Sequence, residues 1–173
     1  DGRFAFEPLW IGKNNLRDHA GLEAYYDTCH GLENGLADAV ESSLFAGRPQ
    51  VYLVKTGQGG SRIAEWALDD TSGYWRKHAQ RIEAAKRQLP AEPQWVVWFS
   101  LGINDAIAGT PIDIWQPAVV AHLRRLKEQL PGAVIVMTQF QAMTNYPAFD
   151  TAIADIAAPE PGVVAVDSTG AAL

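Results

Sequence analysis

Segments with the apolar spacing of helices alternate with short apolar segments typical of strands from residue 31 to residue 166. Helices are predicted where apolar side chains recur every three or four residues, and strands where a short apolar run is bounded by glycine or proline. Strands separated by helices pair in parallel, and helices cover both faces of such a sheet. The sequence therefore predicts an α/β fold with a central parallel sheet. The predicted helices span 32–44, 75–89, 110–130 and 149–158, and the predicted strands span 51–54, 95–99, 133–137 and 162–166.

The segment 110–130 is the clearest helix of the chain. Thr110 stands before Pro111 as a capping residue stands before a proline in the first helical turn. The strand 95–99 is almost wholly apolar, which is the pattern of a strand buried on both faces of a parallel sheet. The tryptophans predicted to lie in the core are Trp95, Trp98 and Trp115.

Composition narrows the class of protein and of ligand. The chain has 173 residues, 47% of them hydrophobic, which fits one domain with a substantial core. Its formal charge of −6 is spread along the sequence, which argues against a nucleic-acid or anionic-membrane surface and favours a small neutral or polar ligand. No apolar run reaches the roughly 20 residues that a membrane helix needs. The lone Cys29, without clustered Cys/His spacings, gives no support for a disulfide, a metal site or a redox cofactor.

Two glycine-bearing loops follow the predicted strands 51–54 and 95–99. The first reads Gly57-Gln-Gly-Gly-Ser61 and the second reads Gly102-Ile-Asn-Asp105. Because ligands of a parallel sheet bind beyond the carboxyl ends of its strands, both loops are expected to face one crevice. The first offers backbone N–H groups and the second an Asn amide, which together would suit an oxyanion hole. The glycines taken alone would equally serve a tight turn, and the first loop lacks the Lys-Ser/Thr ending of a phosphate-binding loop.

These motifs resemble those of the SGNH (GDSL-like) hydrolases, in the branch of sialate O-acetylesterases and carbohydrate acetylesterases. Residues 55–66, including Gly59-Gly-Ser-Arg-Ile-Ala-Glu-Trp66, are similar to the second conserved block, and Gly102-x-Asn-Asp105 is similar to the third. Residues 30–37 resemble the stretch before the second block. The resemblance implies a flavodoxin-like three-layer α/β/α sandwich and ester hydrolysis through a serine acyl-enzyme, without a metal or organic cofactor. It also implies two oxyanion donors, the backbone N–H of Gly60 and the side chain of Asn104.

The chain departs from this family near both of its ends. The first block, which supplies the nucleophilic serine, is missing, and Asp1-Gly-Arg3 resembles the residues that follow it. Residues 163–167 resemble the strand that leads into the family's Asp-x-x-His block, yet the sequence reaches Leu173 without that block. The resemblance thus implies a serine before Asp1 and a histidine after Leu173. It predicts that residues 1–173 form a single SGNH-like domain that is incomplete at both ends.

Other residues offer alternative assignments. Asp27-Thr-Cys-His30 is itself an Asp-x-x-His sequence, so Asp27 and His30 are a second, less favoured candidate for the base and the group that orients it. Ser61 is a less favoured nucleophile because no base is evident beside it. Cys29 is better explained as a structural thiol than as a nucleophile.

Residues near the first loop are candidates for contact with substrate. A tryptophan can stack on a sugar ring, although Trp66 is equally suited to packing at the start of a helix. The histidines outside the Asp-x-x-His sequence lie in polar or helical contexts and are predicted to be solvated; they are His19, His78 and His122. The predicted substrate-contacting residues are Gly59, Ser61, Arg62 and Trp66.

The leading functional hypothesis is a serine esterase that removes O-acyl groups, most simply acetyl, from carbohydrate. The alternative is a non-catalytic glycan-binding or structural module derived from such a hydrolase, which the missing catalytic blocks suggest. A nucleotide-binding domain is disfavoured because phosphate-loop signatures are missing. The expected partner is a small-molecule or carbohydrate ester, with neither nucleic acid nor a membrane.

Overall fold

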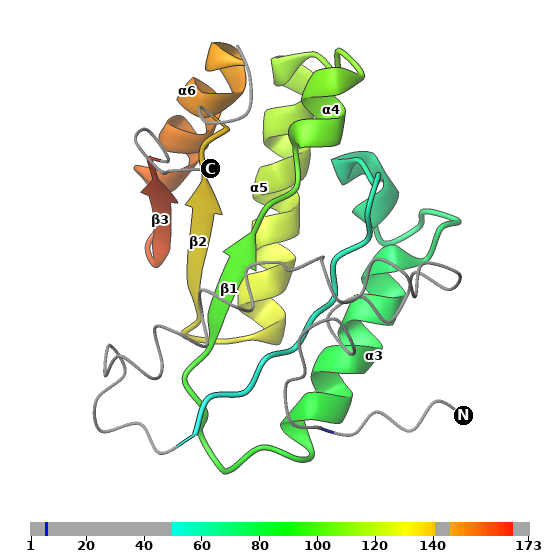
Figure 1. Cartoon of the computed structure of the whole chain (residues 1–173), viewed down its shortest axis with the longest axis vertical. Helices are drawn as coiled ribbons and strands as arrows, with labels where there is room; N and C mark the ends of the chain where they lie inside the picture. The colour runs from blue at the N-terminus through cyan, green and yellow to red at the C-terminus, as the bar shows by residue number, and fades with distance from the viewer. Residues whose placement is uncertain (1–5, 7–49, 141–145, 168–173) are drawn as a thin grey trace, which may run out of the picture. The chain divides into compact units, whose positions relative to one another are not determined.

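The structure, a computed structural model, describes residue 6 and residues 50–140 and 146–167 (Figure 1). Its Cα positions divide into two compact units. The first comprises residues 1–56 and 81–88, and the second comprises residues 57–80 and 89–173. The single-domain organisation stays a prediction. The predicted helix 32–44 lies outside the described residues.

The second unit contains a three-stranded parallel sheet in the order β1-β2-β3. Its strands are β1 (Val96–Phe99), β2 (Val134–Thr138) and β3 (Val163–Val166). In register, Val96 lies opposite Val134 and Ile135 lies opposite Val163. These strands coincide with three of the predicted strands, and the α/β class with a parallel sheet is confirmed.

Helices connect the strands and cover one face of this sheet. The short helix α4 (Ile103–Ile107) follows β1, α5 (Ile112–Gln129) leads to β2, and α6 (Pro147–Ala157) leads to β3. Because each new strand is added on the same side of the previous one, right-handed crossovers place α5 and α6 on the same face (Figure 1). The predicted helices 110–130 and 149–158 are confirmed.

The core lies between that face and the two helices. Alternate residues of the strands point into it, as the two-residue period of a strand requires. The helices contribute side chains spaced three or four residues apart, which form one apolar stripe on each helix. Among the core residues are Phe99, Ile135, Met137, Trp115, Val119, Leu123, Leu126, Phe149, Ile153 and Ile156.

The other residues of the strands are exposed. Trp98 is 47% exposed and Val96 is 64% exposed, so the prediction that strand 95–99 is buried on both faces is wrong for these described residues. The physical reason is that both crossover helices lie on one face and bury only alternate side chains. Trp115 is fully buried as predicted, Trp95 is half-buried, and the core prediction for Trp98 is wrong.

The predicted strand 51–54 is irregular in the structure. Apolar residues form a strand only where their backbone pairs with a neighbour, and no such pairing involves these residues in the described part of the chain. Among the described residues of the first unit, side chains and not a neighbouring strand contact residues 52–55. Phe6 packs on Tyr52 with ring centroids 4.9 Å apart, and Arg81 donates from Nη1 to the Lys55 carbonyl at 3.0 Å.

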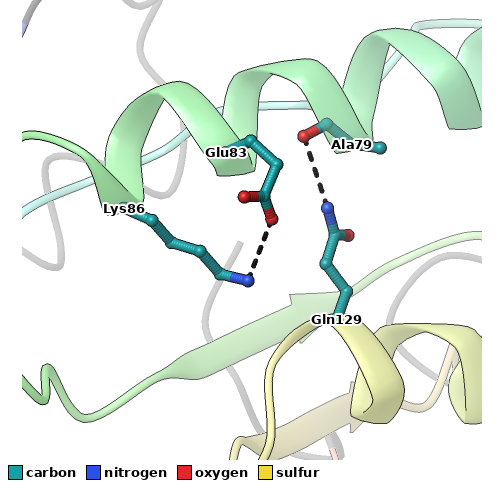
Figure 2. Close-up of polar contacts among 4 residues, drawn as sticks. All are labelled: Ala79, Glu83, Lys86 and Gln129. Carbon is teal, nitrogen blue, oxygen red and sulfur yellow. Dashed lines mark hydrogen bonds and ion pairs between the residues drawn. The ribbon is translucent and has the colours of Figure 1, made fainter.

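The predicted helix 75–89 is confirmed as α3 (Tyr74–Lys86), which follows the short helix η1 (Ile63–Trp66). Residues 74–80 of α3 belong to the second unit, where Gln129 of α5 donates from Nε2 to the Ala79 carbonyl at 3.3 Å (Figure 2). Farther along α3, Lys86 forms an ion pair with Glu83 at 3.0 Å (Figure 2). Because that pair is largely exposed, it contributes little to stability.

Gly102, in the second loop, lies directly against the core. Its φ is +137°, a backbone conformation that residues with a side chain rarely adopt. A Cβ atom there would lie 2.8 Å from Cζ2 of Trp115 and 2.9 Å from Cζ of Phe140. The glycine therefore serves both the turn and the packing.

Replacing Gly102 by alanine is expected to lower the free energy of unfolding by about 3 kcal/mol, from backbone strain and overpacking together. Gly109→Ala is the matched control, because Gly109 has a φ of +71° but open space around its Cβ position. It is expected to cost only about 1 kcal/mol from strain. Urea denaturation of both variants checks the difference. Equal losses would show that the contact with the aromatic rings adds nothing.

Candidate functional site

The two glycine-bearing loops lie against one another in the second unit. Asn104 Nδ2 donates to the Ser61 carbonyl at 3.1 Å, and the Ile63 backbone N–H donates to Asp105 Oδ2 at 3.0 Å. These bonds join segments that are 43 and 42 residues apart in the sequence. The structure thus brings together the loops that contain Gly60 and Asn104. Their role as oxyanion donors stays a prediction.

The backbone of the first loop turns sharply at Gly60. This residue has a φ of +76°, and Ser61 N donates to the Gln58 carbonyl at 3.4 Å to close the turn. Gly59 and Gly60 are exposed, and a Cβ atom at either would meet nothing within 4 Å. The loop therefore presents its main chain, unscreened by side chains, on this side.

Ser61 faces inward. The residue is only 2% exposed, and its hydroxyl donates to the Gln58 carbonyl at 2.8 Å. The same oxygen accepts a hydrogen bond from Trp66 Nε1 at 3.0 Å. A serine hydroxyl has one hydrogen, and here a backbone carbonyl receives it. The hydroxyl thus holds the loop together, so we do not place Ser61 among the reacting groups.

Arg62 and Trp66 were both predicted to contact substrate, and the structure places them differently. Arg62 is exposed, and its backbone N–H donates to Glu65 Oε2 at 2.7 Å. Trp66 is 3% exposed, and its ring packs on Tyr74 with centroids 5.6 Å apart. The buried indole has no open face for a sugar, so of these two residues only Arg62 remains a candidate for binding.

Two buried histidines lie beside Trp66. The ring of His122 meets that of Trp66 edge to face at 5.9 Å, and His78 stacks on Trp75 at 5.0 Å. His78 is 6% exposed and His122 is 3% exposed, so the prediction that they are solvated is wrong. Both belong to the apolar stripes of their helices, at helical spacing from Trp75 and Leu126 respectively, and this spacing was the available signal. His19 lies outside the described residues.

Burial keeps these two imidazoles neutral. Loss of hydration lowers the pKa of His78 to about 4, against a smaller opposing effect of its hydrogen bond with Gln129. Burial also lowers the pKa of His122 to about 3, and the positive charge of Arg125 acts in the same direction. Arg125 Nη2 lies 3.3 Å from His122 Nδ1 and donates to the Trp66 carbonyl at 3.1 Å.

Asp105 is a buried carboxylate that sequence reasoning did not select as a site residue. It is 1% exposed. Its Oδ2 accepts from the Ile63 N–H, and its Oδ1 accepts from Thr110 Oγ1 at 3.4 Å. Burial raises the pKa of Asp105, and the hydrogen bond from Ile63 opposes that rise. Thr110 was predicted to cap α5, but Pro111 is the N-cap residue and Thr110 turns to Asp105 instead.

The remaining candidates have no structural description. Asp27, Cys29 and His30 lie outside the described residues. Within the described ranges, no group of three or more His, Cys, Asp or Glu side chains is arranged to hold a metal ion. None of the described helices has the length and apolar character to cross a membrane.

Comparison with protein-family models, with curated protein sequences and with solved structures found no match for this chain.

The buried histidines predict a loss of stability in mild acid. Below pH 6.5 the unfolded chain binds protons at His78 and His122, whereas the folded chain does not until the pH nears 4. The free energy of unfolding therefore does not depend on protonation of these two histidines above pH 6.5, and it is expected to fall as the pH is lowered from 6.5 to 5. The limiting slope is about 1.4 kcal/mol per pH unit for each histidine.

Urea denaturation at pH 7.0, 6.0 and 5.0 measures this slope, and His122→Leu is the informative variant. Its slope is expected to be about half that of the unmodified protein, since one of the two sites is lost. An unchanged slope in this variant would show that His122 does not carry the effect.

Proposed function

We propose that this chain forms the oxyanion-binding part of an SGNH-type O-acyl esterase that acts on acetylated carbohydrate. The observation that carries the proposal is the hydrogen bond from Asn104 to the Ser61 carbonyl. It brings a neutral amide donor to the residue that follows Gly60, whose own backbone is exposed. The two groups come from separate segments of the same unit, and an oxyanion hole can be built from donors on separate segments.

The chemistry follows from the donors. Attack on an ester carbonyl places negative charge on its oxygen, and fixed N–H donors stabilise that charge. The Asn104 carboxamide carries two N–H hydrogens, of which one bonds the Ser61 carbonyl and orients the group. The second would serve the oxyanion together with the Gly60 N–H. An amide is suited to this role because it stays neutral throughout the reaction.

The proposal assigns the reacting groups to residues outside the printed sequence. A serine that precedes Asp1 would attack the acyl carbon, and a histidine that follows Leu173 would take its proton. The same histidine would return the proton to the departing sugar hydroxyl, and water would then hydrolyse the acyl-enzyme. Asp27 and His30 remain the less favoured source of the base.

We also propose which residues contact the substrate and how the sheet is layered. The exposed backbone of Gly59 and the exposed side chain of Arg62 would contact the sugar. We also propose that the sheet is the middle layer of a three-layer α/β/α sandwich. The apolar character of Trp98 and Val96, which lie on the uncovered face, supports this, because strands in such a fold are apolar on both faces.

One observation favours a second candidate, a non-catalytic glycan-binding or structural module. Ser61, the serine of the first loop, has its hydroxyl buried and bonded to a carbonyl. A protein that had kept the donors but lost the nucleophile would still bind acetylated sugar. Fluorophosphonate labelling of the native protein, followed by mapping of the modified residue, separates the candidates. Labelling of a serine outside the printed sequence would favour the esterase, and no labelling would favour the binding module. Labelling of Ser61 would overturn both candidates, because neither gives this serine a reacting role.

Asn104→Ala is expected to lower kcat/KM of the native protein for 4-nitrophenyl acetate by about 10²- to 10³-fold, mainly through kcat. The reason is that the lost donor acts on charge that develops only in the transition state. Asp113→Ala, an exposed change in the first turn of α5, is the control and is expected to leave kcat/KM unaltered. Thermal melting shows whether each variant is folded. Unaltered kcat in folded Asn104→Ala would remove this residue from the mechanism.

A further inference from the structure

Asp105 is a carboxylate buried among the apolar side chains of the core. Its neighbours in sequence and space include Ala106 and Ile63, both buried members of that core. Removing a carboxylate from water is costly unless hydrogen bonds replace the lost hydration. In the described part of the chain, the atoms that bond this carboxylate are neutral donors, a backbone N–H and a hydroxyl. Such a costly group is explained by what its bonds hold in place.

The bonds of Asp105 join three segments of the second unit. Oδ2 accepts from the N–H of Ile63, the first residue of η1, and Oδ1 accepts from the hydroxyl of Thr110, just before α5. The main chain adds a third bond, since Thr110 N donates to the Asp105 carbonyl at 2.9 Å. Asp105 itself lies on α4. One buried residue of the second loop thus links η1, which follows the first loop, with the start of α5.

The bond to Ile63 lies close in sequence to the bond that Asn104 makes. Asn104 reaches Ser61 at 3.1 Å, and Asp105 is reached by Ile63 at 3.0 Å, so adjacent residues of α4 bind residues two apart on the facing segment. A single hydrogen bond would let the first loop pivot about it. Two bonds at different points also fix its orientation.

We propose that Asp105 is a positioning residue that aligns the Gly60 N–H with the Asn104 carboxamide. This inference rests on the proposed function, in which those two groups bind one oxyanion. Asp105 does not touch the reacting atoms; it acts through Ile63, which stands three residues after Gly60. Catalysis depends on such alignment, since displacement of a positioned group by about 1 Å can cost 10²-fold in rate.

The choice of substitutions follows from the atoms involved. Asp105→Asn keeps one carbonyl oxygen for the Ile63 N–H and offers an amide hydrogen to the Thr110 hydroxyl, which can also accept. Asp105→Ala removes both acceptors and leaves the Ile63 N–H without them. Asp150→Ala is the matched control, because Asp150 is also buried and accepts a backbone N–H, that of Phe140, but lies on α6.

The experiment measures amide hydrogen exchange at residues 60–63 and steady-state kinetics with 4-nitrophenyl acetate on the native protein. In Asp105→Ala, exchange at Ile63 is expected to rise about tenfold or more. The same variant is expected to lose about 10- to 100-fold in kcat with little change in KM. Asp105→Asn is expected to restore both within about threefold, as the conservative variant of a positioning residue should.

Asp150→Ala is expected to change neither, although it lowers the melting temperature. If Asp105→Ala does not fold, Asp105→Ser, too short to reach Ile63, carries the same expectations.

The positioning role of Asp105 and the proposed esterase activity can fail independently. Unchanged exchange at Ile63 in a folded Asp105→Ala variant overturns the positioning role, whatever the activity. Equal effects of Asp150→Ala and Asp105→Ala also overturn it, because general destabilisation would then explain both. If the unmodified native protein shows no turnover, the esterase proposal fails, while exchange at Ile63 still tests whether Asp105 aligns the loop.

Discussion

The burial of one stripe of α5 is the interaction on which the rest of the second unit depends. Trp115, Val119 and Leu123 on this stripe are almost completely inaccessible to solvent. Each such side chain contributes about 1.5–3 kcal/mol when it is removed from water, and the same stripe contacts the sheet, α6 and η1. Because Trp115 also meets Gly102, the second loop is shaped directly by this packing. The site is therefore an extension of the core.

The same helix carries polar groups into that stripe, and they connect the core with the first loop. His122 packs against Trp66, whose carbonyl accepts from Arg125 and whose Nε1 donates to Ser61. Ser61 in turn closes the loop through the Gln58 carbonyl. The conformation of a loop with few apolar residues is thus fixed by a chain of directional bonds. Such a chain is specific because each buried donor or acceptor left unpaired would cost about 1–3 kcal/mol.

Sequence periodicity predicted most of the regular elements but not their environments. The helix over residues 110–130 and three of the four strands were predictable because their apolar spacing is a direct consequence of burial. Residues 51–54 have the composition of a strand, but pairing with a neighbour is a property of the whole fold and cannot be read from four residues. Trp98 shows the same limit, since which face of a strand is covered depends on the side on which the connecting helices cross.

The candidate site was predictable to a similar degree. The meeting of the Gly60 and Asn104 loops was predicted from a general rule, that loops after parallel strands share one edge of the sheet, although only the Asn104 loop follows a strand of the described sheet. The burial of His122 was missed because a histidine was assumed to be solvated, although its helical position marked it as inward-facing. Asp105 was missed because its partners are a backbone N–H 42 residues away and a hydroxyl 5 residues away. No local sequence pattern predicts such contacts.

These two kinds of outcome have one physical origin. Apolar burial acts without direction, so it leaves a periodic trace in the sequence and tolerates many local arrangements. Hydrogen bonds to buried groups such as Asp105 act through single atoms, so they leave no periodic trace but permit only one arrangement of the segments they join. An oxyanion-binding site needs the second property, because donors must stand ready before charge develops. It follows that the hydrogen bonds of Asn104 and Asp105 with residues 61–63, which no periodicity predicts, are also the ones on which the proposed chemistry depends.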